Sequence, residues 1–181
     1  MQRSLANPKN MVYMFVGHEL KLVYYIGSRE MVWKNMALQT VGGLRKTELK
    51  EVGELAGCAA LENLNAWGGA ALTKLPALSG CAALRDLTLS GCKELQEVSG
   101  LGECLALTKV RAERCTMLKE FPALAGNGTR RHLHLPGCTE LQAVGSLSGC
   151  GNLGHLELTG CRRLREVPAL SGCSKLERLT L

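Results

Sequence analysis

Aromatic side chains are scarce in this chain of 181 residues, in which Phe, Trp and Tyr together make up 4%. The core must therefore come from aliphatic side chains, packed in many small and similar layers. Long apolar runs are also missing, because no segment reaches the roughly 18 apolar residues that a membrane helix needs. The best candidate, MVYMFVG at 11–17, is followed at once by His18, Glu19 and Lys21. We therefore expect a soluble, cytoplasmic protein with no membrane partner.

The motifs of common catalytic and cofactor sites are missing as well. No nucleophile–base pair or acidic dyad stands out, and GLGECLAL does not open a helix as a phosphate-binding loop would. No C-x-x-C pair supports a zinc site. The net charge of +6 is diffuse, and residues 1–37 alone contribute +3, from five Lys or Arg and two Glu. We therefore expect neither an enzyme nor a cofactor, and no nucleic-acid partner.

What the sequence does contain is a regular spacing of cysteines. PALSGC occurs at 76–81 and again at 168–173, and the cysteines follow one another in alternating steps of 11 and 12 along the numbering. Gly69 and Asn127 occupy the two positions at which this alternation skips a cysteine, so the full period is 23. A fixed period of about 20–29 residues predicts a solenoid. The nine cysteines are Cys58, Cys81, Cys92, Cys104, Cys115, Cys138, Cys150, Cys161 and Cys173.

Each period is expected to hold one short strand. In the clearest unit, LRDLTLSGCKELQEVSGLGECLA, apolar residues recur every third position except for one two-residue step, from Leu87 to Leu89. A two-residue step is typical of a β-strand, and the triplet steps suit tight turns, 3-10 or extended segments. Residues 1–37 do not follow the period and are expected to form an N-terminal cap or a degenerate first repeat. The remaining array, 38–181, divides into 38–60, 61–83, 84–106, 107–129, 130–152, 153–175 and a partial unit, 176–181.

Two segments carry a resemblance to a known family. LRDLTLSGCKEL and LGHLELTGCRRL match L-x-x-L-x-L-x-x-C-x-x-L and so resemble the leucine-rich repeat in its cysteine-containing form, as in plant disease-resistance receptors and trypanosomatid leucine-rich repeat proteins. The resemblance implies an α/β solenoid, a right-handed horseshoe with a parallel β-sheet on its concave face and turns with short 3-10 or extended segments on its convex face. The alternative, a parallel β-helix, would need more than one two-residue step per coil. The family hosts many unrelated binding functions.

Both cysteine positions of the period fall among the core positions. A buried, reduced cysteine behaves as a small hydrophobic residue with a weak S–H donor, which can bond a turn carbonyl. Because nine is an odd number and equivalent positions give no natural pairing, we expect all nine thiols to be reduced. Asn127, in the glycosylation motif NGT, occupies a cysteine position, so we expect it to face inward and not to carry a glycan.

The outward-facing strand residues are the candidate binding site, and Ser90 at the end of one strand is expected to face solvent with them. A rigid row of strands with varied side chains forms a binding platform, and the strongest anchors of protein interfaces are aromatic residues and arginine. We predict a non-catalytic protein–protein interaction module. The alternatives are a structural subunit of a large assembly and the substrate-recognition part of a larger ubiquitin-ligase or receptor system. The predicted contact residues are Asn63, Asn65, Trp67, Asp86, Lys109, Arg111, Glu113, His132, His134, His155, Glu157 and Arg178.

One part of this platform is rich in histidine. HLHL at 132–135 is followed one period later by HLEL at 155–158, which places His132 beside His155 and His134 beside Glu157. Strand spacing brings the four side chains within reach of one ion, and two histidines with a carboxylate can hold zinc. A histidine-rich contact patch is the favoured interpretation, and a metal site is the minor alternative.

The sequence stops at LERLTL, one strand into a coil. Leu176, Val167 and the strand at 178–181 are therefore expected to lie beside water, because a solenoid needs a cap over its last layer. We expect that the chain continues in its natural context, or that a partner or a second copy covers this end and the chain self-associates.

Overall fold

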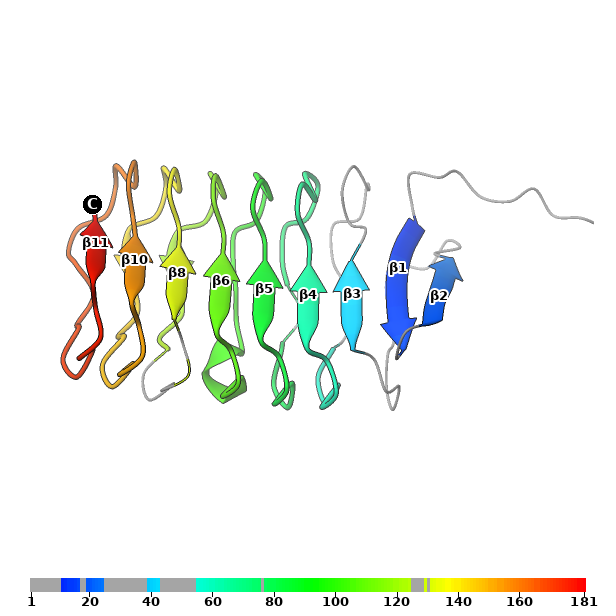
Figure 1. Ribbon diagram of the computed structural model, residues 1–181. Coiled ribbons are helices and arrows are strands. Elements are labelled where there is room, and N and C mark those ends of the chain that lie inside the picture. Colours follow the sequence, from blue (N-terminus) through cyan, green and yellow to red (C-terminus); the bar gives the residue numbers. More distant parts are fainter. Residues whose placement is uncertain are drawn as a thin grey trace, which may run out of the picture.

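The computed structural model describes residues 11–16, 19–24, 39–42, 55–75, 77–124, 129 and 131–181. The array forms a stack of coils, each of which adds one short strand to the same parallel sheet (Figure 1). The chain is therefore a parallel-strand β-solenoid. Its successive strands are β3 (Thr40–Gly42), β4 (Asn63–Asn65), β5 (Asp86–Thr88), β6 (Lys109–Arg111), β8 (His132–His134), β10 (His155–Glu157) and β11 (Arg178–Thr180).

The strand register confirms the predicted period. Leu64 lies opposite Leu87, Leu87 opposite Val110, and the same step continues through Leu133 and Leu156. In the main-sheet strands β5, β6, β8 and β10 the middle residue is buried and its two neighbours are partly exposed. Since side chains alternate along a strand, a slip of one residue would turn this buried row to solvent.

Two further strands extend the sheet beyond β3. β1 (Met11–Val16) and β2 (Glu19–Tyr24) form an antiparallel hairpin, and β1 also pairs with β3 in the antiparallel sense. This pairing differs from the parallel pairing between coils. It covers the edge of β3 that faces away from the array (Figure 1).

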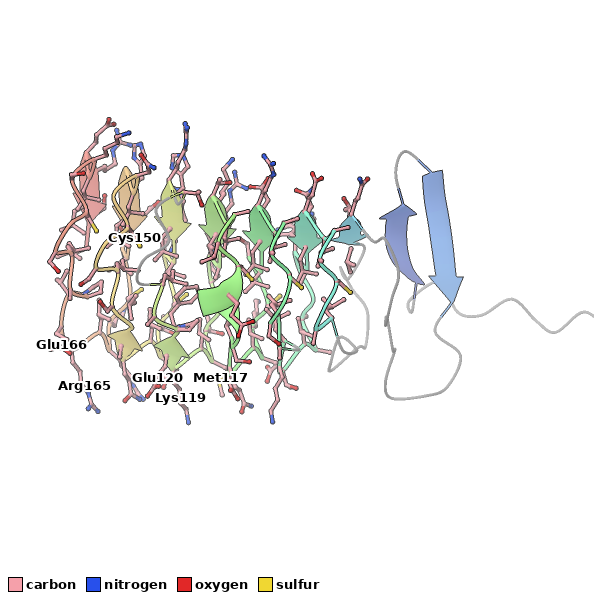
Figure 2. All side chains as sticks on the ribbon, turned by 90° about the horizontal axis from the view of Figure 1, so that it is seen from below. Met117, Lys119, Glu120, Cys150, Arg165 and Glu166 are labelled. Atoms are coloured by element: carbon pink, nitrogen blue, oxygen red, sulfur yellow. The ribbon has the colours of Figure 1, made fainter. Side chains whose placement is uncertain are left out.

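The opposite side of the stack carries a second, shorter ladder. β7 (Glu120–Phe121) pairs in parallel with β9 (Ala143–Val144), and an isolated bridge joins Lys74 to Glu97. Figure 2 shows these short strands on the side of the stack opposite the main sheet. The expectation of one strand per coil is therefore wrong for these coils. Their triplet steps place extended segments of successive coils side by side, where their backbones pair.

Helical structure is nearly missing from the described residues, where a single 3-10 turn spans Leu101–Glu103. The expected α/β class and horseshoe are accordingly not confirmed, and the confirmed architecture is the parallel β-solenoid. None of the helical structure in the described ranges is long and apolar enough to cross a membrane.

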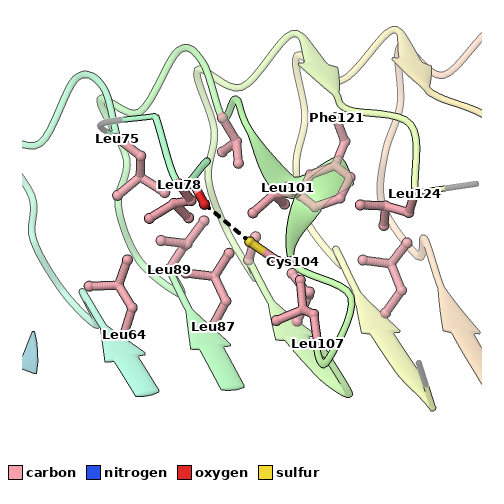
Figure 3. Packing of buried hydrophobic residues seen from close by; sticks show 14 of the residues in the cluster. Leu64, Leu75, Leu78, Leu87, Leu89, Leu101, Cys104, Leu107, Phe121 and Leu124 are labelled. Atoms are coloured by element: carbon pink, nitrogen blue, oxygen red, sulfur yellow. Dashed lines mark hydrogen bonds between the residues drawn. The ribbon is translucent and has the colours of Figure 1, made fainter. Parts of the chain in front are cut away.

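The core is aliphatic, as the composition indicates. Leucines of successive coils stack between the two ladders, and Phe121 is the one aromatic residue in the core of the described part. Figure 3 shows Leu87, Leu89, Leu101 and Phe121 converging in this layer. Full burial of one such side chain stabilises the fold by about 1.5–3 kcal/mol. Each coil gains the same stabilisation from the core side chains that it buries.

Cysteine thiols connect each coil to the one before it. The Cys92 thiol donates to the carbonyl oxygen of Ala66 at 3.0 Å, and the Cys138 thiol donates to that of Ala112 at 3.0 Å. Figure 3 shows the corresponding bond from Cys104 to Leu78. In every case the acceptor lies 26 residues earlier, which is one period plus three. The same bond is made by Cys81, Cys115, Cys150, Cys161 and Cys173.

Several of these acceptor carbonyls also close a turn within their own coil. The Leu55 oxygen accepts the Cys58 backbone N–H at 3.1 Å and the Cys81 thiol at 3.2 Å. The Leu89 oxygen likewise accepts the Cys92 N–H and the Cys115 thiol. A carbonyl oxygen has two lone pairs, so one bond shapes the corner and the other holds the next coil in place.

All nine cysteines are reduced thiols, and seven of them are buried. Burial raises the pKa of Cys81 to about 12 and that of Cys92 to about 11. These thiols therefore keep the proton that they donate. Because the thiolate is the reactive form, they are also poor nucleophiles.

The last coil is less well covered than the others. Cys161, Leu164 and Leu176 are only partly buried, whereas Val167 is 42% exposed and Leu181 is 62% exposed. A hollow of about 390 Å³ opens among Leu158, Cys161, Leu164, Val167 and Leu181. The expectation that apolar side chains lie beside water at this end is confirmed.

We expect the buried thiols to resist Ellman's reagent in the native protein. Cys161 and Cys173, at the less covered end, should react first, and all nine should titrate once guanidinium unfolds the chain. Absorbance at neutral pH follows both reactions. Rapid modification of Cys115 or Cys138 in the folded protein would contradict the buried ladder, and fewer than nine titratable thiols in unfolded, freshly purified protein would reveal disulfides.

A second expectation concerns the close packing of two coils at Gly145. A Cβ at this position would lie 2.3 Å from the backbone nitrogen of Ala123. Gly145→Ala should therefore lower the free energy of unfolding by about 1–3 kcal/mol, because the obstacle is backbone and cannot rotate away. Gly102→Ala is the matched control, since nothing lies within 4 Å of its added Cβ. Equal denaturation midpoints for the two variants would show that the coils separate more easily than this packing implies.

Candidate functional site

The outward-facing residues of β4, β5, β6, β8, β10 and β11 form one surface, here named the sheet face. Its register places Asp86 beside Lys109, Lys109 beside His132, and His155 beside Arg178. A second row is formed by the residues two positions later in each strand, and it runs from Asn65 through Arg111 and His134 to Glu157. The predicted strand residues therefore lie together on this face. Trp67 and Glu113 lie beyond the strands, at the corner where the chain turns.

Charge is unevenly distributed on the sheet face. β4 presents Asn63 and Asn65, and β5 presents Asp86 beside a threonine, so this half is neutral to acidic. From β6 onward the side chains are mostly cationic or titratable, namely Lys109, Arg111, His132, His134, His155 and Arg178, with Glu157 as the one carboxylate. Because the strands are only about 5 Å apart, these groups form one electrostatic surface.

The histidines make direct contacts with one another. The rings of His132 and His155 are stacked with their centroids 4.9 Å apart, and the rings of His132 and His134 are 5.8 Å apart. His134 Nδ1 lies 3.1 Å from Glu157 Oε2. The predicted neighbours are confirmed.

The minor hypothesis of a metal site at these four residues is not supported. Among the residues that the structure describes, no group of three or more His, Cys, Asp or Glu is arranged to hold a metal ion. The physical reason is that His132 stacks on His155, while His134 approaches Glu157, so the donor atoms do not converge on one point.

Burial lowers the pKa of His132, and the positive charges of His155, His134, Lys109 and Arg111 lower it further. His132 is therefore neutral at a pH where a free histidine would already be partly protonated. Acidification adds positive charge to a surface that already carries Lys109 and Arg111.

Two residues at the corner depart from the sequence-based expectation. Ser90, expected to face solvent, is only 7% exposed, because the chain turns there and strand alternation no longer applies. Arg114 is not among the predicted site residues. It has a positive φ of 56° at the position where neighbouring coils have Gly91 and Gly137. When the corner positions of successive coils are aligned in the sequence, Arg114 is the residue that stands in place of a glycine.

Comparison of the chain with protein-family models, curated protein sequences and solved structures found no match.

The lowered pKa of His132 predicts a pH-dependent stability. His132 binds a proton more readily in the unfolded chain than in the folded one. Its contribution to the stability of the fold is therefore present above the ordinary histidine pKa. That contribution is lost as the pH falls through the ordinary pKa toward the lower pKa of His132 in the folded chain. The melting temperature should fall between pH 7.5 and 5.5, and His132→Gln should reduce that fall. Asn63→Gln, in the same row of the sheet face, is the control. Identical pH profiles for wild type and His132→Gln would contradict the assignment.

Proposed function

We propose that the chain is a non-catalytic interaction module of the cysteine-containing leucine-rich repeat type, which binds a protein partner on its sheet face. In this proposal the sheet face is the concave side of a right-handed horseshoe, and the protein works in the cytoplasm with its thiols reduced. The match of LRDLTLSGCKEL to the repeat pattern supports the class, since Leu84, Leu87, Leu89 and Cys92 are all buried as that pattern requires.

The observation that carries the proposal is the contrast between the two sides of each strand. The inward position is a buried Leu or Val from β4 to β10, at Leu64, Leu87, Val110, Leu133 and Leu156. The outward positions differ from coil to coil and are not needed for core packing. Varied polar side chains on a uniform, rigid scaffold are what selective recognition requires.

The cationic half of the sheet face indicates the chemistry of the partner. Lys109 and Arg111 are partly exposed, lie on adjacent positions of one strand face and border the histidine patch. Complementary potentials guide association and exclude partners of like charge. We therefore propose that the partner presents an acidic surface to β6, β8 and β10.

A structural subunit is the second candidate, in which another chain or a continuation of this one covers the last coil. Leu179 and Leu181 are 43% and 62% exposed, and no other described strand pairs with the outer edge of β11. An unpaired edge of this kind pairs readily with another strand. Sedimentation of the purified chain tests whether this edge mediates self-association, and a monomer at all concentrations would contradict that.

Charge reversal on the sheet face tests the principal proposal. Lys109→Glu with Arg111→Glu should weaken capture of the partner about tenfold, because two attractive contacts become repulsive. Stability should change by no more than about 0.5 kcal/mol, as is usual for surface positions. The matched control is Lys119→Glu with Arg165→Glu, which makes the same charge change on the opposite side of the stack (Figure 2).

Affinity purification with each variant as bait, followed by mass spectrometry, gives the comparison. A partner that both wild type and the Lys119/Arg165 variant retain, and that the Lys109/Arg111 variant loses, supports the sheet face. A partner retained equally by both variants would place the binding surface elsewhere.

A further inference from the structure

Three histidines lie close together on the sheet face, and two of them form a stack. The centroids of the His132 and His155 rings are 4.9 Å apart with an interplanar angle of 21°, and the His134 ring lies 5.8 Å from that of His132. All three residues are partly exposed, so a partner can reach them. Two imidazolium rings at this distance repel each other. The pair of His132 and His155, here named the histidine stack, therefore holds positive charge at a cost unless a negative charge lies close by.

The strands on both sides of the histidine stack present further positive charge. Lys109 and Arg111 of β6 border it on one side, and Arg178 of β11 borders it on the other. Asp86 of β5 lies beyond Lys109 and is separated from the stack by that strand. A proton on the stack therefore adds to charge of the same sign on its two neighbouring strands.

The carboxylates near the histidine stack do not pair with it. Glu157 lies 3.1 Å from His134 and so is engaged by the third histidine. Glu177 lines a hollow of about 250 Å³ beside the stack, but Arg131 and Lys175 line the same hollow. Within the described ranges, neither ring of the stack forms an ion pair with a carboxylate. Positive charge therefore prevails around the stack, and the lowered pKa of His132 agrees with this.

We propose that a carboxylate of the partner binds over the histidine stack and that the stack takes up one proton from solvent when it does so. The carboxylate supplies the negative charge that the stack lacks, and its hydrogen bond to an imidazolium is stronger than one to a neutral ring. Because coupling between two binding events is reciprocal, conditions that favour protonation also favour the partner.

The inference rests on the proposed function, since it assumes an acidic partner on the sheet face, and it adds a regulation to that binding. The affinity changes little well above the ordinary histidine pKa. It rises as the pH falls through that value toward the lower pKa of His132 in the free, folded chain. The module therefore holds its partner more tightly in mildly acidic solution.

The test uses an acidic peptide and needs no knowledge of the partner. N-acetyl-hexaaspartate amide, whose carboxylates are ionised from pH 5.5 to 7.5, is titrated into the full chain at constant low ionic strength by isothermal titration calorimetry. Binding should be about fivefold to tenfold tighter at pH 5.5 than at pH 7.5, because one linked proton changes an affinity by at most about tenfold per pH unit. Titration at pH 6.5 in two buffers of different ionisation enthalpy should show a net uptake of protons.

Variants of the stack separate its protons from those of other groups. His132→Gln with His155→Gln should remove most of the rise in affinity at low pH. His132→Arg carries a permanent charge and should bind the peptide at pH 7.5 about as tightly as wild type does at pH 5.5. The matched control is Glu120→Gln, which removes a titratable group from β7 on the opposite side of the stack of coils and should keep the wild-type profile (Figure 2). Melting temperatures show that each variant is folded.

The outcomes distinguish this inference from the function on which it rests. An unchanged rise in affinity in the double glutamine variant, or no proton uptake by wild type, would overturn the role of the histidine stack. Peptide binding that is independent of pH but is lost by Lys109→Glu with Arg111→Glu would remove the proton coupling and leave the proposed function standing. A chain that binds the peptide at no pH would count against both.

Discussion

The hydrogen bond from a cysteine thiol to a carbonyl of the preceding coil is the constraint on which the rest of this structure depends. A stack with a thin aliphatic core buries backbone carbonyls at its corners, and each of them needs a partner that lies inside the core. A serine hydroxyl would donate to the carbonyl, but its own oxygen would then need a hydrogen-bond donor inside the core. Alanine has no donor, so the carbonyl would lose one hydrogen bond. Cysteine is apolar enough to pack against leucine and still donates one proton. The Leu89 oxygen, which accepts from Cys92 within its coil and from Cys115 of the next, shows how one atom joins the two levels of structure.

This constraint separates the residues that hold the fold from those that are available for recognition. The inward positions of the strands and both cysteine positions are tied to neighbouring coils, so substitutions there disturb packing in more than one layer. The outward side chains border only one another. Residues as different as Asp86, Lys109 and His132 can therefore occupy the same position in successive coils without altering the backbone. The corner combines both kinds of residue. Trp67 is exposed there, whereas Ser90, at the same position of the next coil, is buried.

Much of this arrangement can be predicted from the sequence, because a strict period turns one local pattern into a global register. Once Leu87 and Leu89 mark a strand, the period places His132 beside His155 without further information. The prediction weakens where the alternation of a strand ends. Triplet steps fit several backbone conformations, so spacing does not predict the pairing of Glu120–Phe121 with Ala143–Val144, and it places Ser90 on the wrong side of a turn. The donor geometry of the histidine patch depends on ring orientation, which spacing alone does not determine.

The reach of the thiol bond, 26 residues or one period plus three, also governs which changes in chain length the molecule can absorb. Duplication or loss of one whole coil leaves every donor opposite an acceptor and every leucine in its layer, because each coil contacts only its neighbours. An insertion or deletion one residue longer or shorter than a whole coil moves the cysteine thiols out of register with their carbonyl acceptors at that point. Unequal recombination between repeats can therefore lengthen or shorten this protein in whole coils, and each event brings two formerly separate strands together on the sheet face. New combinations of surface side chains then arise without any point substitution.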